Sequence, residues 1–192
     1  KNRGCEVEYT KKIKIDEIKK ADYIILTSSI ICHETELEAL KQIVNCGKKV
    51  FVIGIFGNVA KDKYKTINSF VVPGEAESFF SNVELNKNSL QKYFSNKEND
   101  DTSKKTIPNM VDNLDDLPFP DWNYYTKKYA LRNNFLDFNS KTAIPITATR
   151  GCPYSCFNYC TYPLQQGRKV RFRSVQNVVK EIKHWISTLG TN

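Results

Sequence analysis

Over roughly the first 80 residues, short apolar runs alternate with stretches in which apolar side chains recur at helical spacing. The pattern predicts a strand at Cys5–Tyr9, a helix at Ile13–Lys20, a strand at Tyr23–Thr27, a helix at Glu34–Val44, and strands at Lys49–Gly54 and Ser69–Val72. The strands after the first are almost wholly apolar, which is typical of strands buried on both faces. The predicted fold class is therefore α/β, with an open parallel sheet that helices cover on both sides.

The pattern changes after this region. Residues 81–106 lose their periodicity and are rich in Asn, Ser, Lys, Asp and Glu, which predicts a linker or exposed loop. In the segment Leu114–Trp122, two prolines favour an extended path. Leu117, Phe119 and Trp122 are available as apolar anchors, so we expect this segment to dock rather than to carry chemistry.

Strand and helix signals return toward the end of the sequence. Ala143–Ile146 is predicted to be a strand, and Val170–Arg173 a short alternating stretch. Ser174 is expected to cap a helix at Val175–Leu189, where apolar side chains form a clear stripe.

Three cysteines, Cys152, Cys156 and Cys160, lie within nine residues between that strand and that helix. Three thiols cannot all form disulfides with one another. An iron–sulfur cluster is normally held by four thiolates, so a set of three leaves one iron open for a substrate or cosubstrate. A zinc site more often has paired C-x2-C knuckles or nearby histidines, whereas His33 and His184 lie far away in sequence. The residues favour a cluster, with zinc or inert thiols as the alternatives.

The run Arg150–Pro163 resembles the signature of the radical S-adenosylmethionine (SAM) enzymes, which place three cysteines, usually spaced C-x3-C-x2-C, after the first strand of a (β/α) barrel. The spacing here is C-x3-C-x3-C, which changes the expected path of the loop more than the identity of the ligands. The resemblance implies that the three cysteines bind a [4Fe–4S] cluster, and that SAM on its open iron is cleaved reductively to a 5′-deoxyadenosyl radical. It also places Tyr159 near the adenine of SAM and gives Gly151 a part in shaping the loop.

The predicted sheet resembles the second half of the Rossmann-like cobalamin-binding domain that precedes many radical SAM barrels. The resemblance rests on Ala21-Asp22 before a strand that ends in Thr27-Ser28-Ser29, on the strand Val50–Gly54, and on a Gly-Glu-x-Glu turn within Val72–Glu77. It implies ligand contacts at the carboxyl ends of the strands. The candidate cofactor-binding residues are Thr27, Ser28, Ser29, Gly54, Gly74, Glu75 and Glu77. The chain lacks the Asp-x-His-x-x-Gly motif of cobalamin domains that displace the lower base. Members without the motif exist, so the residues leave cobalamin binding open.

These resemblances imply a partial Rossmann-like domain at residues 1–82 without its first strand, a linker and docking segment at 83–140, and the start of a radical SAM barrel at 141–192. Lys1 is not an initiator methionine, and a barrel needs more than one strand and one helix. We therefore expect an internal part of a longer enzyme, inactive by itself. The implied reaction is methylation of an unactivated carbon or phosphorus, or a cyclisation. The implied partners are a small-molecule substrate and an electron donor such as flavodoxin or ferredoxin.

The formal net charge of +8 changes this picture little. Most of the excess is lysine spread along the chain, without a nucleic-acid-binding motif, so nucleic acid is not an expected partner. Four of the six arginines do lie in or beside the cysteine run, where they are expected either to pair with the charge of a cluster and its cosubstrate or to flank a strand at the surface. No apolar run approaches the roughly 20 residues that span a bilayer, and no secretion signal is evident, so we expect a cytoplasmic protein without a membrane segment.

Two other interpretations stay open at this point. A non-catalytic Rossmann-like module could carry zinc, or an inactive cluster, on the cysteine run. A methylthiotransferase-like radical SAM enzyme would use Cys5, Cys32 and Cys46 for a second cluster. Their spacing and the Gly-Glu-x-Glu turn favour instead a role as small core residues. His33 is expected to start a helix or to lie at the surface.

Overall fold

The computed structural model describes residues 4–10, 12–66, 68–95, 110–122, 144–154, 156, 160 and 162–189. The chain divides into two compact units. Unit 1 comprises Lys1–Val111 and Cys152–Arg168, and unit 2 comprises Asp112–Gly151 and Lys169–Asn192. The cysteine run therefore belongs to the same unit as the first part of the chain. The domain boundaries expected from the sequence stay predictions.

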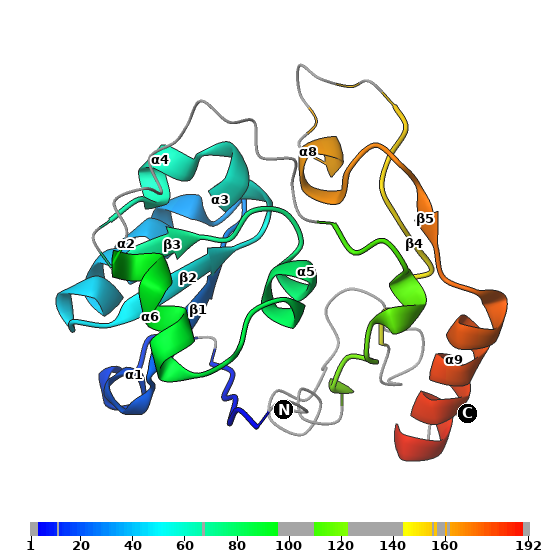
Figure 1. Ribbon diagram of the computed structural model, residues 1–192, viewed down its shortest axis with the longest axis horizontal. Coiled ribbons are helices and arrows are strands. Elements are labelled where there is room, and N and C mark those ends of the chain that lie inside the picture. Colours follow the sequence, from blue (N-terminus) through cyan, green and yellow to red (C-terminus); the bar gives the residue numbers. More distant parts are fainter. Residues whose placement is uncertain are drawn as a thin grey trace. The chain divides into compact units, whose positions relative to one another are not determined.

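Unit 1 is built on a three-stranded parallel sheet in the order β1–β2–β3 (Figure 1). The strands are β1 Tyr23–Thr27, β2 Lys49–Ile53 and β3 Ser69–Val71. The helices are α1 Ile15–Lys20, α2 His33–Asn45, α3 Ile55–Val59, α4 Lys61–Tyr64, α5 Ala76–Ser81, α6 Lys87–Ser95 and α8 Tyr162–Gln166. Because the strands are parallel, their carboxyl ends meet at one edge of the sheet. The predicted α/β class and parallel sheet are confirmed.

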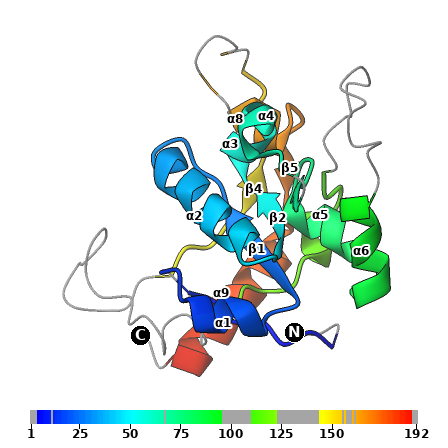
Figure 2. The same cartoon turned by 90° about the vertical axis from the view of Figure 1, so that its left-hand side faces the viewer.

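Each face of this sheet has its own apolar core. Side chains alternate along β2, so Val50 and Val52 point to one face while Phe51 points to the other. The first core adds Ile18, Leu40, Ile43, Tyr64 and Val71, and the second adds Val72, Phe79, Val83 and Leu90. Figure 2 shows α2 and α6 on opposite sides of the strands. Burial on both faces explains why β2 reads as a continuous apolar run.

Two predictions for unit 1 were wrong. Cys5–Tyr9 is not a strand, because within the described residues it has no neighbouring strand with which to form a ladder. The stretch predicted to be a linker contains α6. Leu90 of this helix is buried, and Tyr93 and Phe94 pack against the second core. The remaining predicted helices and strands of unit 1 agree with the structure to within two residues at either end.

Unit 2 combines a two-stranded antiparallel sheet with a long helix. Its elements are the 3-10 helix η2 Leu114–Asp116, the strands β4 Thr149–Arg150 and β5 Arg171–Phe172, and α9 Val175–Leu189. The predicted cap of α9 is confirmed, since Ser174 Oγ accepts the Asn177 N–H at 3.1 Å. The ring centres of Phe119 and His184 lie 5.7 Å apart, so the docking segment packs on α9.

The strand predicted at Ala143–Ile146 is displaced in the structure. Residues 144–148 are irregular, and the strand begins at Thr149, while Ala143 lies outside the described residues. Among the described residues β4 pairs only with the two-residue β5. One further hydrogen bond, from Arg173 N–H to Ala148 O at 2.9 Å, extends the pairing. A strand cannot be longer than the ladder that satisfies its backbone groups. The start of a (β/α) barrel stays a prediction.

Of the helices that the structure describes, none is both long and apolar enough to cross a bilayer. The expected cytoplasmic location stays a prediction.

Candidate functional site

The three cysteines lie on one loop, residues 152–167, which we call the cysteine loop. Its two ends are joined by a hydrogen bond in which Cys152 N–H donates to Gly167 O at 3.0 Å. Inside the loop, Cys160 N–H donates to Cys156 O at 3.0 Å. All three thiols are free and half-buried. The loop is therefore closed at its base, with Cys152 at the point of closure.

The donor chemistry of the cysteine loop fits a cluster, but the structure does not assemble one. Three unpaired thiols are the ligands that iron–sulfur clusters use. Among the described residues, however, no three Cys, His, Asp or Glu side chains are grouped closely enough to hold a metal ion. Tyr159, the expected neighbour of the adenine, lies outside the described residues. Cluster and SAM binding therefore stay predictions.

Gly151 precedes the cysteine loop and is required by the local packing of the backbone. Its φ of +101° lies in the region that favours glycine. A Cβ at this position would lie well inside van der Waals contact with the backbone oxygen of Lys169, which precedes β5. This close approach is sufficient to explain a glycine before Cys152.

The cysteine loop packs against the part of unit 1 that follows β2. Its helix α8 contacts α3, which begins directly after Gly54. The loop's last residue, Gly167, lies beside Met110, because a Cβ built on Gly167 would be 3.7 Å from Met110 Cε. The thiol-bearing loop and the sheet therefore form one compact unit, although they are more than 70 residues apart in sequence.

Ser28 joins the carboxyl ends of β1 and β2. Its buried Oγ donates to Ile53 O at 2.8 Å and accepts the Gly57 N–H at 2.6 Å. The backbones approach so closely that a Cβ on Gly54 would lie 2.5 Å from Ser28 O. Gly54 also has a φ of +104°. The fold itself thus accounts for a small polar residue at Ser28 and for a glycine at position 54.

Glu36, on α2, holds the loop that follows β1. Its carboxylate accepts the Ser29 N–H and the Ser29 Oγ–H, each at 2.8 Å. It also accepts the hydroxyl of Tyr64 at 3.2 Å. Burial, and then the charge and hydrogen bond of Glu36, raise the pKa of Tyr64 to about 12. Glu36 was not predicted as a site residue. The signal for it in the sequence is an acidic side chain in the first turn of a helix, just after a loop that contains two serines.

The turn after β3 carries the remaining candidates. Gly74 N–H donates to Asn58 Oδ1 at 3.2 Å, and the Asn58 amide donates to Gly54 O at 3.0 Å, so one side chain links the ends of β2 and β3. Glu75 is 6% exposed and accepts the Val111 N–H at 2.7 Å. Glu77 is exposed in the first turn of α5. The candidates from Thr27 to Glu77 therefore lie at or just after the carboxyl ends of the three strands. Their role in binding a cofactor stays a prediction.

Some residues expected near the site have other positions. Arg173 forms a buried ion pair with Glu181 inside unit 2, where the two side chains are 9% and 1% exposed. This arginine is therefore paired within unit 2. Cys32 is exposed, in contrast to the expected core position, because it lies in the loop before α2. His33 begins α2 as expected, with Nδ1 2.9 Å from Ile30 O.

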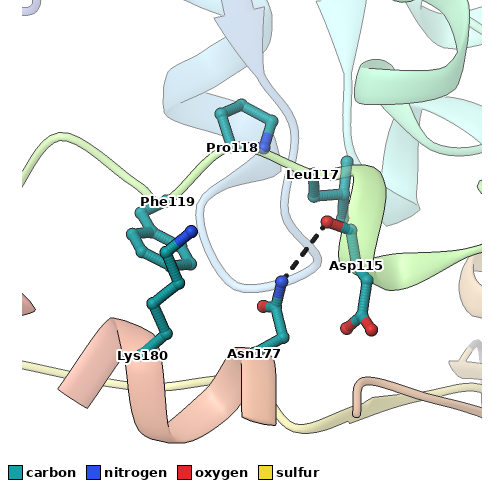
Figure 3. Close-up of a pocket in the computed structure, with 6 residues that line it drawn as sticks. All are labelled: Asp115, Leu117, Pro118, Phe119, Asn177 and Lys180. Carbon is teal, nitrogen blue, oxygen red and sulfur yellow. Dashed lines mark hydrogen bonds between the residues drawn. The ribbon is translucent and has the colours of Figure 1, made fainter. Parts of the chain in front are cut away.

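Unit 2 has a shallow pocket of about 240 Å³ beside the docking segment. It is lined by Asp115, Leu117, Pro118, Phe119, Asn177 and Lys180. Figure 3 shows the Asn177 amide reaching the backbone oxygen of Asp115, a hydrogen bond of 3.4 Å. The Asp115 carboxylate accepts the Ser174 N–H at 2.9 Å. These contacts attach η2 to the start of α9, which accounts for Asp115 and Asn177 at the pocket without a ligand.

Comparison with known proteins gives one informative match. No family model matches the chain, and no solved structure matches it. The chain is similar to bacteriochlorophyllide d C-12(1)-methyltransferase of Chlorobaculum tepidum, with 25% identity over 146 residues. The likeness is to a methyltransferase. The match covers 75% of this chain but 28% of that protein, so the chain spans less than a third of its relative.

Proposed function

We propose that this chain is part of a radical SAM enzyme in which Cys152, Cys156 and Cys160 are the thiolate ligands of a [4Fe–4S] cluster. The observation that carries the proposal is the set of three free thiols on one loop, closed by the hydrogen bond from Cys152 to Gly167. Similarity to a methyltransferase supports methyl transfer as the overall reaction. SAM serves as the cosubstrate in this proposal.

The chain's own residues supply the ligands and their positions. The thiolate is the form of cysteine that binds metal, so the three thiols lose their protons on loading. Because the base of the loop is already closed, the three thiols lose less conformational entropy when they converge on a cluster. A bound [4Fe–4S] cluster would supply the one electron that cleaves SAM to methionine and a 5′-deoxyadenosyl radical, and the protein would supply orientation and exclusion of water. Tyr159 is proposed to lie beside the adenine, and Gly151 to direct the chain into the loop.

The proposal extends to a carbon- or phosphorus-methyltransferase that binds cobalamin at the carboxyl edge of the unit 1 sheet. Open parallel sheets bind their ligands at this edge. Thr27 and Glu77 are exposed there, while the buried Ser28 and Glu75 and the half-buried Gly54 shape the edge. A small-molecule substrate, an electron donor such as flavodoxin or ferredoxin, and a cytoplasmic location complete the proposal.

Anaerobic reconstitution with iron and sulfide tests the cluster. The wild-type chain is expected to bind about four iron atoms and to show brown iron–sulfur absorbance. Changing any one of Cys152, Cys156 or Cys160 to Ala is expected to abolish both. Stoichiometric zinc without that absorbance would contradict the proposal and support a zinc-binding module. Release of 5′-deoxyadenosine from SAM by the full-length protein with a reductant separates an active enzyme from an inactive cluster loop.

Cys32→Ser is the matched thiol variant for this experiment. Cys32 is an exposed free thiol outside the cysteine loop, so its replacement is expected to leave the iron content unchanged. If the wild type instead held about eight iron atoms, and Cys32→Ser lost half of them, a second cluster of the methylthiotransferase kind would replace the single-cluster proposal.

A further inference from the structure

Glu75 has a structural partner that is distant in sequence. Its side chain is 6% exposed, at the turn between β3 and α5, and its Oε2 accepts the backbone N–H of Val111 at 2.7 Å. A hydrogen bond to a charged acceptor is roughly twice as strong as a neutral one. Burial also protects it from competing water. Glu75 therefore fixes the backbone at residues 110–111.

Met110 continues this contact toward the cysteine loop. Its backbone oxygen accepts a hydrogen bond from Ser78 Oγ at 3.5 Å, so α5 holds the same segment a second time. Its side chain covers Gly167, since a Cβ built there would lie 3.7 to 3.9 Å from Met110 Cε, Cγ and Sδ. Gly167 has a φ of +76°, which suits glycine at the end of the loop.

Gly167 in turn holds Cys152, because its carbonyl oxygen accepts the Cys152 N–H at 3.0 Å. A continuous series of contacts thus runs from Glu75 through Val111, Met110 and Gly167 to Cys152. We propose that Glu75 is a positioning residue for the cysteine loop, which it anchors through the segment at 110–111. The consequence for metal loading rests on the proposed function, whereas the anchoring of the loop does not.

Hydrogen exchange in the metal-free, full chain tests the anchoring directly. In the wild type, the Cys152 amide is expected to be protected by its bond to Gly167. Glu75→Ala is expected to speed its exchange about tenfold, because the anchor of the covering segment is lost. Glu75→Gln retains a side-chain oxygen that can accept the Val111 N–H, and is expected to restore most of the protection.

Leu90→Ala is the control for a general loss of stability. Leu90 is buried in the second core of the same unit, and the series of contacts does not run through it. Each protein is measured the same number of degrees below its own melting temperature. Under this condition, the Cys152 amide of Leu90→Ala is expected to exchange at a rate close to that of the wild type. Equal acceleration in both variants would overturn the inference, as would unchanged exchange in Glu75→Ala.

Met110→Ala keeps the test decisive if Glu75→Ala does not fold. It removes the side chain that covers Gly167 and is expected to speed Cys152 exchange as well; unchanged exchange would refute the anchoring. Iron retention against a chelator is the second measurement, and Glu75→Ala is expected to lose iron faster than Leu90→Ala; equal rates would count against the anchoring. If the wild type binds no iron, the proposed function fails, and the exchange result alone decides the inference.

Discussion

The buried ion pair of unit 2 allows a quantitative test of how α9 is held. Arg173 and Glu181 are 9% and 1% exposed, so replacing either leaves the other charge buried without its counter-ion. Breaking such a pair by removing one partner typically costs about 3–5 kcal/mol. Arg173 also donates to Asn177 Oδ1 at 2.9 Å and to Thr147 O at 3.0 Å. Arg173→Met loses these hydrogen bonds too, so its loss of unfolding free energy is expected at the upper end of this range. Glu181→Gln keeps them and is expected at the lower end.

Tryptophan fluorescence during urea unfolding is the appropriate measurement. Both tryptophans of the chain, Trp122 and Trp185, belong to unit 2, so the signal reports this unit. Lys180→Met is the matched control, because it removes an exposed cation from the same helix; a change within about 0.5 kcal/mol is expected.

A double variant separates the charge effect from the packing effect. Replacing both partners, Arg173→Met with Glu181→Leu, leaves no buried charge and is expected to cost less than either single change. A Glu181→Gln cost below about 1 kcal/mol, the value typical of exposed pairs, would refute the reasoning. A double variant that is as unstable as the sum of the two single variants would refute it too.

Two further predictions concern unit 1, and circular dichroism can follow both. Gly54→Ala is expected to destabilise the unit more than Gly47→Ala; both glycines have positive φ, but only at position 54 does a Cβ meet Ser28 O at 2.5 Å. Equal losses would show that the close approach is unimportant. Because the pKa of Tyr64 is raised from 10.0 to about 12, its contribution to stability is present below pH 10 and is lost as the pH rises toward 12. Tyr64→Phe should lack this pH dependence, and an unchanged alkaline profile would contradict the assignment.

The sheet of unit 1 could be predicted because its strands have a strong local signal. β2 is apolar on both faces, and the alternation with amphipathic helices is typical of a parallel sheet. α9 could be predicted for a similar reason, since its apolar stripe and the cap at Ser174 agree. In β2 the local pattern and the tertiary environment favour the same structure. In α9 the signal is local, since Trp185 is buried but Val179, Ile182 and Ile186 of the stripe are exposed.

Other elements depend on partners that a local pattern does not reveal. α6 lies in a polar stretch, and it forms because Leu90, Tyr93 and Phe94 reach the aromatic core around Phe51. The alternating pattern at Cys5–Tyr9 resembles a strand, but the described residues offer it no ladder. The same limit explains why the strand expected at Ala143–Ile146 begins only at Thr149, where β5 provides hydrogen-bond partners.

The candidate site shows how residue type and residue role can separate. The sequence predicts Ser28, Gly54 and Glu75 as ligand contacts because they lie at the carboxyl edge of a parallel sheet, where such sheets bind ligands. In the structure each has a partner within the chain. Ser28 joins two strands, Gly54 allows the backbone of Ser28 to approach closely, and Glu75 accepts the Val111 N–H. Loss of corrin binding on mutating these three would therefore not show direct contact, since each change also disturbs the edge. Thr27, exposed at the end of β1, is a more informative position for that question.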